Sequence, residues 1–118
     1  MRAEGRDLSF LWDMRQAAKE IIEFMVGTSY DKFARDKQLR YAVERQLMVI
    51  GEAAAHVSIK FQECHSEILW KQIVGQRNVL AHEYGEILVE RIWLTATTNI
   101  PQLLDQIEKL IPKENEQG

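Results

Sequence analysis

Apolar residues recur at steps of three and four along almost the whole chain, which is the period of an α-helix. The first such run predicts a helix over about 7–26, with Asp7 placed to cap its start and Gly27 to end it. No stretch alternates between apolar and polar residues, as a half-buried β-strand would. The pattern therefore predicts an all-α protein.

A short turn and the longest helix follow. Ser29 could cap a single turn that carries Tyr30 and Phe33 inwards, and Asp36 is placed as the N-cap of a helix over about 37–62. The apolar positions of this long helix fall on one face, which we expect to be buried. They are Leu39, Val43, Leu47, Ile50, Ala54, Val57 and Phe61.

Small residues gather in the middle of the long helix. Gly51 is followed closely by three alanines at 53–55, and a glycine inside a helix costs up to about 1 kcal/mol relative to alanine. This composition suggests that another helix passes very close to this point.

A second stripe on the long helix mixes charged, aromatic and apolar residues. It is either a solvated outer face or the wall of a groove beside a functional motif, because an unpaired buried charge is too costly to keep. The stripe consists of Tyr41, Arg45, Met48, Glu52 and His56.

The rest of the chain also reads as helical. Ser66 could cap a helix that begins at about residue 67, is interrupted at Gly75 and ends at Gly85. A last helical stretch covers about 87–111, and Pro101 should kink or divide it. We expect a bundle of four or five helices in a single domain over 1–118, with 1–6 and 113–118 frayed.

Composition limits the possible partners. With 118 residues, a net charge of −3 and a sequence pI near 5.6, nothing global steers the protein towards nucleic acid or an anionic membrane. Cys64 is the only cysteine, which excludes an internal disulfide. The start of the chain does not resemble a signal peptide and no apolar run is long enough to span a bilayer, so we expect a soluble, cytoplasmic protein.

The segment 76–85 brings a cation, an imidazole and a phenol together. Arg77 offers a rigid fork of donors suited to phosphate, and His82 can exchange protons near neutrality. Together they suit RNA phosphodiester cleavage without a metal, with Asn78 to orient either partner and Tyr84 to add a hydroxyl. On one ideal helix, however, Arg77 and His82 would stand about 140° apart. Either the helix ends near Ala81, or a second copy of the chain completes the site.

The same residues also permit a simpler interpretation. An arginine and a histidine at this spacing occur by chance in many proteins, and a histidine near the end of a helix often only interacts with the helix dipole. The chain has three histidines, with His56 and His65 as the other two, and no cluster of carboxylates at ligand spacing around them, which argues against a zinc site.

Over nearly its whole length the chain resembles the HEPN superfamily, and within it the small HepT-like toxins that pair with minimal nucleotidyltransferases. The motif of that branch is an arginine, four residues beginning with a polar one, a histidine, any residue and a tyrosine. This sequence matches it at Arg77, Asn78, His82 and Tyr84. Further matching blocks are Arg6-Asp7, 30–33, 42–45, 50–53, 70–73, Trp93 and Pro101.

The resemblance implies a homodimer in which two motifs face each other across a cleft. It implies metal-independent endoribonuclease activity without a cofactor, with Arg77 and His82 as catalytic residues. It also implies that Tyr84 accepts AMP from a cognate MntA-like nucleotidyltransferase antitoxin, which neutralises the toxin. Arg45 and Glu52 are candidate supporting residues, and a dimer could combine two copies of Arg45, Arg77 and Lys71 into a basic cleft.

Two other functions stay open. The protein could be a non-catalytic helical partner that positions a nucleotidyltransferase, or a structural dimer in which Arg77 and His82 have no chemical role. Cleavage of RNA by the purified protein, and its loss on replacing either residue, separates these hypotheses.

Overall fold

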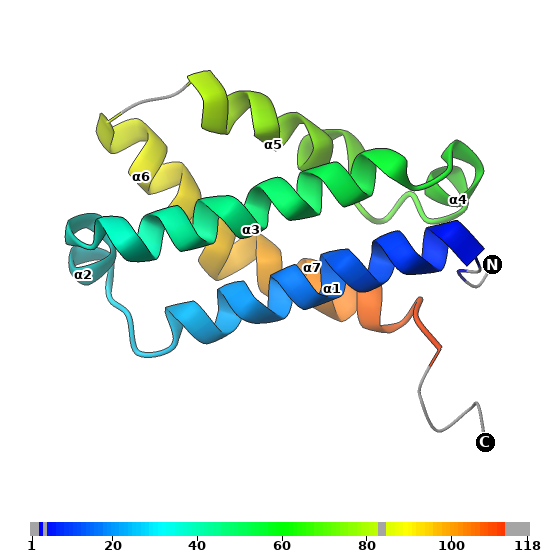
Figure 1. Cartoon of the computed structure of the whole chain (residues 1–118), viewed down its shortest axis with the longest axis horizontal. Helices are drawn as coiled ribbons and strands as arrows, with labels where there is room; N and C mark the ends of the chain where they lie inside the picture. Colours follow the sequence, from blue (N-terminus) through cyan, green and yellow to red (C-terminus); the bar gives the residue numbers. More distant parts are fainter. Residues whose placement is uncertain (1–2, 4, 83–84, 113–118) are drawn as a thin grey trace.

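The structure is a computed structural model that describes residues 3, 5–82 and 85–112. Within these ranges every regular element is helical, which confirms the predicted all-α fold class (Figure 1). None of these helices is long and apolar enough to cross a membrane. In chain order the elements are α1 (Gly5–Met25), α2 (Tyr30–Arg35), α3 (Lys37–His56), α4 (Ile59–Cys64), α5 (Trp70–His82), α6 (Gly85–Leu94), a π-helical turn η1 (Thr95–Asn99) and α7 (Ile100–Glu108).

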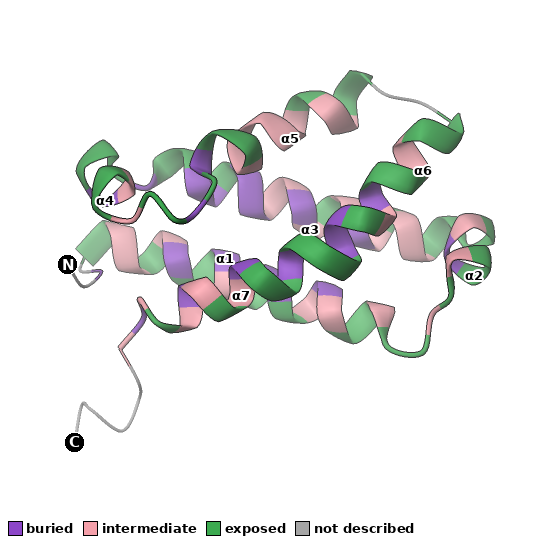
Figure 2. Ribbon diagram, turned by 180° about the vertical axis from the view of Figure 1, so that it is seen from behind, coloured by how far each residue is buried: buried purple, intermediate pink, exposed green. Residues whose placement is uncertain are grey.

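The core lies where α1, α3 and α7 pack together. Each helix contributes residues spaced by three or four, so that they share one face, and Figure 2 shows the buried positions turned towards the centre of these helices. Burying each large apolar side chain stabilises the fold by about 1.5–3 kcal/mol. The largest fully buried side chains include Leu11, Met14, Ile21, Val43, Leu47 and Ile107.

The two predicted caps before α3 are confirmed. The Ser29 hydroxyl accepts a hydrogen bond from the Lys32 amide at 3.2 Å, and the Asp36 carboxylate accepts one from the Leu39 amide at 3.0 Å. Phe33 is fully buried, as the pattern of the short turn predicts. The first turns of α2 and α3 are therefore each stabilised by a cap residue in the local sequence.

The prediction of one helix over 37–62 is wrong in one respect, because the chain turns at Val57. Val57 has an extended backbone, and Ser58 caps the new helix α4 by accepting a hydrogen bond from the Phe61 amide at 3.2 Å. The Asp7 carboxylate accepts hydrogen bonds from the Ser58 amide at 2.8 Å and its hydroxyl at 2.7 Å. Asp7 therefore lies inside α1 and braces the start of α4, instead of capping α1.

The start of α5 and its continuity at Gly75 differ from the prediction, whereas the predicted end falls next to residues 83 and 84, which lie outside the described residues. Ser66 does not begin this helix. The chain first makes a turn in which the Trp70 indole donates to the His65 carbonyl at 3.0 Å, and α5 starts at Trp70. The helix then continues through Gly75 without a break and ends at His82, while Gly85 opens α6 with a positive φ of 68°.

Pro101 divides the last helical stretch differently from a simple kink. A proline has no amide hydrogen to donate to the preceding turn. The chain accommodates this with the π-helical turn η1, in which the Ile100 amide donates to the Thr95 carbonyl, five residues back. The turn keeps Ala96 and Ile100 buried, so the helix continues on the core.

Candidate functional site

Helix α5 carries the motif and lies along α3 (Figure 1). The two helices pack tightly against each other at Gly51. A Cβ atom at this position would lie 3.1 Å from Cγ of Arg77 and 3.4 Å from the Ile73 carbonyl oxygen. The small residues of α3 therefore mark a close helix contact, as the sequence suggests, and the residue that fills the space is Arg77.

An ion pair holds the far end of the same arginine. One terminal nitrogen of Arg77 donates to the Glu52 carboxylate at 2.7 Å. The two side chains remain 35% and 56% exposed, so the pair contributes at most about 1 kcal/mol to stability. Its main effect is on geometry, because it fixes the direction of the guanidinium above α3.

A groove of about 330 Å³ opens beside this pair, between α3 and α5. The charged and aromatic stripe predicted on α3 forms one wall, so it lines a groove in its first half. Glu52 and His56, which belong to the same stripe, do not line it. The groove residues are Tyr41, Glu44, Arg45, Met48, Arg77, Leu80 and Ala81.

Three of these residues, Glu44, Leu80 and Ala81, escaped the sequence analysis. Glu44 was detectable, because it stands three residues after Tyr41 and four before Met48, which is the spacing of the stripe itself. Burial raises the pKa of the Glu44 carboxyl above its usual 4.5, and the charge of Arg40 partly opposes this effect on the pKa. This carboxylate makes no ion pair with the other described residues.

His82 does not meet Arg77 within one chain. The helix continues regularly to His82, so the two side chains point in different directions around α5. His82 and Asn78 are both exposed, and His82 has no hydrogen-bond partner among the described residues. Tyr84, the proposed acceptor of AMP, lies outside the described residues.

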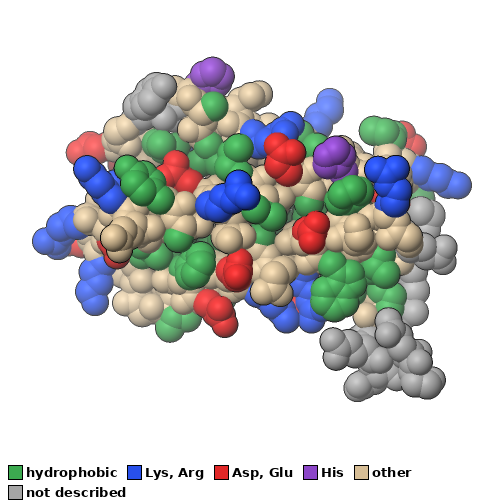
Figure 3. Space-filling model, in the orientation of Figure 1, with side chains coloured by type: hydrophobic (Ala, Val, Ile, Leu, Met, Phe, Trp, Pro, Cys, Tyr) green, Lys and Arg blue, Asp and Glu red, His purple; other side chains and the backbone are tan. Residues whose placement is uncertain are grey.

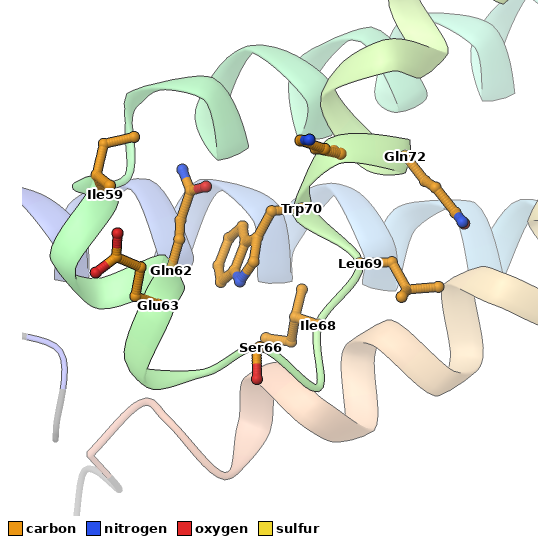
Figure 4. Close-up of a pocket in the computed structure, with 9 residues that line it drawn as sticks. Ile59, Gln62, Glu63, Ser66, Ile68, Leu69, Trp70 and Gln72 are labelled. Atoms are coloured by element: carbon orange, nitrogen blue, oxygen red, sulfur yellow. The ribbon is translucent and has the colours of Figure 1, made fainter.

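The other cation expected near the motif lies elsewhere. Lys71 lines an apolar hollow at the start of α5, where the Trp70 ring lies beside Gln62 and Ile68 (Figure 4). Among the described residues, only Arg45 and Arg77 therefore contribute cations to the groove. Figure 3 shows that basic and acidic side chains alternate on the face of α1, α3 and α5. Any strongly basic surface here would require a second copy of the chain.

A larger cavity of about 780 Å³ lies on the other side of α5, against η1 and α7. The Gln76 carboxamide spans it and donates to the Thr95 hydroxyl at 3.0 Å. The remaining histidine of interest, His65, packs against the Phe61 ring with the ring centres 4.4 Å apart, so it is not a solvated loop residue. In the described part of the chain, no group of three histidine, cysteine or carboxylate side chains is placed to hold a metal ion.

Comparisons with known proteins agree on one family. The family model described as "Ribonuclease HepT-like" matches residues 14–110. The "Putative RNase MJ1380" of Methanocaldococcus jannaschii is 35% identical over 85% of this chain and 92% of its own length. "Putative RNase TTE0752" of Caldanaerobacter subterraneus is 36% identical over 89% and 94%, and "Probable ribonuclease HepT" of Thermococcus cleftensis 35% over 86% and 92%. No solved structure matches the chain significantly.

Proposed function

Because the chain belongs to the HepT-like ribonuclease family, we propose that it cleaves RNA without a metal, with Arg77 and His82 as its catalytic residues. Arg77 stabilises the charge that develops on the phosphate oxygens. His82 removes the proton of the ribose 2′-hydroxyl or gives a proton to the leaving 5′-oxygen. The reaction needs a cation that stabilises the phosphate charge and a group that transfers protons, and the motif supplies both.

The geometry of Arg77 is the observation that supports this function. Its stem is held against Gly51 and one nitrogen is held by Glu52, while the remaining donors are not bound to described residues. An arginine fixed in this way loses little side-chain entropy when it binds a phosphate. Glu52 therefore acts as a positioning residue, and Arg45 is a second contact for the RNA backbone.

We expect the active site to be completed by a second copy of the chain. Arg77 and His82 diverge within one α5, and α5 has only Trp70 fully buried, so much of its surface is available for a partner helix. In a symmetric dimer, each arginine can face the histidine of the other protomer. Duplication also brings two copies of Arg45 and Arg77 together, which offsets the acidic net charge of the chain.

Mixed dimers test this arrangement directly. Dimers with Arg77→Ala in one protomer and His82→Ala in the other contain one intact pair of residues if each site uses both protomers. They contain none if each site uses a single protomer. Recovery of about half the parental cleavage in mixed dimers, with none in either pure variant, supports the shared site. No recovery from dimers that form normally contradicts it.

Regulation at Tyr84 completes the proposal. A partner nucleotidyltransferase would transfer AMP from ATP to the phenol oxygen and release pyrophosphate. The adenylate then obstructs and repels an RNA phosphate two residues from His82. Intact mass after co-expression with such a partner should rise by one adenylate, and Tyr84→Phe should prevent the increase and leave the protein toxic. An unchanged mass in the presence of active partner and ATP contradicts this role.

The catalytic proposal rests on one experiment with the purified protein. The purified protein should cleave RNA in the presence of a chelator, and Arg77→Ala or His82→Ala should abolish this cleavage. The same substitutions should abolish growth arrest when the protein is expressed in the cytoplasm of a cell. If the parent protein cleaves no RNA and both variants still bind the nucleotidyltransferase, the protein is instead a non-catalytic partner.

A further inference from the structure

The groove between α3 and α5 holds groups that the cleavage reaction does not use. Tyr41 stands on its wall with 62% of its surface exposed, and its ring packs against no other aromatic ring of the described chain. This ring is more exposed than Trp12, at 38%, or Phe24, at 36%, so it offers a free face on which a planar ligand can stack. Its neighbour on the same wall is the Glu44 carboxylate, which has no ion-pair partner among the described residues.

The size and lining of the groove suit a flat, partly apolar ligand. Its volume of about 330 Å³ is at the lower end of the range of ligand pockets, about 300–1,000 Å³. Met48 and Leu80 supply apolar contacts from the two helices, and Arg77 stands at the same groove. A ligand here would therefore be joined to the phosphate that Arg77 contacts.

The geometry points to this groove as the binding site for an unpaired RNA nucleobase beside the cleaved phosphate, stacked on Tyr41 and read by Glu44. This inference rests on the proposed ribonuclease function and names the part of the substrate that the site selects. Unpaired bases stack on exposed aromatic rings in many single-strand-binding proteins. Both arginines of the groove remain available for the backbone on either side of the base.

The carboxylate of Glu44 sets the direction of selectivity. It is a pure acceptor when ionised, so it favours a base that offers an exocyclic amino group, as adenine, cytosine and guanine do. Uracil has a single N–H that lies between two carbonyl oxygens, and the carboxylate repels these oxygens. We expect the site to prefer an amino-bearing base over uracil by about tenfold or more, the usual discrimination of a good base contact.

Binding experiments can separate this inference from the cleavage reaction. The His82→Ala protein would be titrated with short RNAs that carry A, C, G or U at one position in an otherwise constant sequence, and with the free mononucleotides. A 2-aminopurine at the variable position reports stacking through quenching of its fluorescence. The variants Tyr41→Phe, Tyr41→Ala and Glu44→Gln would be compared in this background, with Phe24→Ala and Glu23→Gln, on the surface of α1, as matched controls.

We expect quenching in the parent and in Tyr41→Phe, and its loss in Tyr41→Ala with affinity weakened about tenfold to a hundredfold. Glu44→Gln should keep the quenching but lose the preference against uracil. Tighter binding of the RNAs than of mononucleotides assigns the site to the substrate strand, and the reverse order assigns it to a free nucleotide.

Three results overturn the inference. They are unchanged base preference in Tyr41→Ala and Glu44→Gln, equal losses in the α1 controls, or a monomeric Tyr41→Ala protein by sedimentation, which would make the groove a contact between copies. If the base preference is as expected but the wild-type protein, with His82 intact, cuts no RNA, the ribonuclease proposal fails and the base site stands.

Discussion

Replacing Gly51 with alanine tests whether the close approach of α3 and α5 positions Arg77. At a helical site with free space, glycine to alanine stabilises a protein by about 0.5–1 kcal/mol. At Gly51 the new Cβ would lie 3.1 Å from Cγ of Arg77, so this atom must retreat by at least about 0.3 Å to reach an ordinary contact. The Ile73 carbonyl oxygen, 3.4 Å away, is at an ordinary contact distance, so Arg77 is the group that must move.

The expected cost to catalysis follows from the length of the arginine side chain. A shift at Cγ grows along the three further bonds, so the guanidinium moves by up to about 1 Å. A misplacement of about 1 Å costs roughly a hundredfold in rate. We therefore expect Gly51→Ala to lower kcat/KM by about tenfold to a hundredfold, or about 1.4–2.7 kcal/mol of transition-state stabilisation. The 2.7 Å pair between Arg77 and Glu52 should break as well.

Gly75 provides the matched control. It is also a helical glycine, on α5 itself, and a Cβ there would meet nothing within 4 Å. Gly75→Ala should therefore gain the full helical stabilisation in urea unfolding at matched protein concentration, while its cleavage rate stays unchanged. Gly51→Ala should gain clearly less stability. Equal stability gains and equal cleavage by the two variants would refute the positioning of Arg77 by Gly51.

Three smaller predictions concern the scaffold. Asp7→Ala removes the acceptor of both hydrogen bonds from the start of α4 and should lower unfolding stability by about 1 kcal/mol, while Asp13→Ala on the exposed side of α1 should not. Thr95→Val removes the hydroxyl that accepts a hydrogen bond from the Gln76 carboxamide. It should lower the free energy of unfolding by about 1 kcal/mol in thermal unfolding, with Thr98→Val at an exposed site as control. Burial raises the pKa of Glu44, so the folded state binds its proton more tightly than the unfolded state. Wild-type stability should therefore fall as pH rises from the usual value of 4.5, whereas the Glu44→Gln protein should lack this fall and be the more stable at pH 7.

The hydrophobic pattern predicted the buried faces better than the ends of the helices. Val57 and Phe61 are buried, as their place in the α3 stripe predicts, although a turn separates them from that helix. The turn carries neither glycine nor proline, and its cause is a contact with Asp7, 51 residues earlier. Local sequence could reveal Ser58 as a possible cap, but not the distant carboxylate that secures it.

For the candidate site too, local sequence indicated some features, while others depend on contacts between helices. The sequence singled out Arg77 and His82 as candidate catalytic residues, and that role stays a prediction. The stripe on α3 indicated a nearby groove, which the structure contains. The pairing of Arg77 with Glu52 depends on how two helices cross, which spacing within one helix does not determine. The local sign of that crossing was the group of small residues, Gly51 and the alanines at 53–55.

Helix α5 buries fewer side chains than α1, α3 or α7, since Trp70 is its single buried residue and its half-buried side chains, such as Ile73 and Leu80, lie at the edge of the core. Substitutions along its outer surface should therefore cost little folding free energy, and most lie within about 0.5 kcal/mol of neutral. The exposed side chains of this helix can therefore change without altering the core that α1, α3 and α7 form. The helix should also open on its own in hydrogen exchange, well before the molecule unfolds.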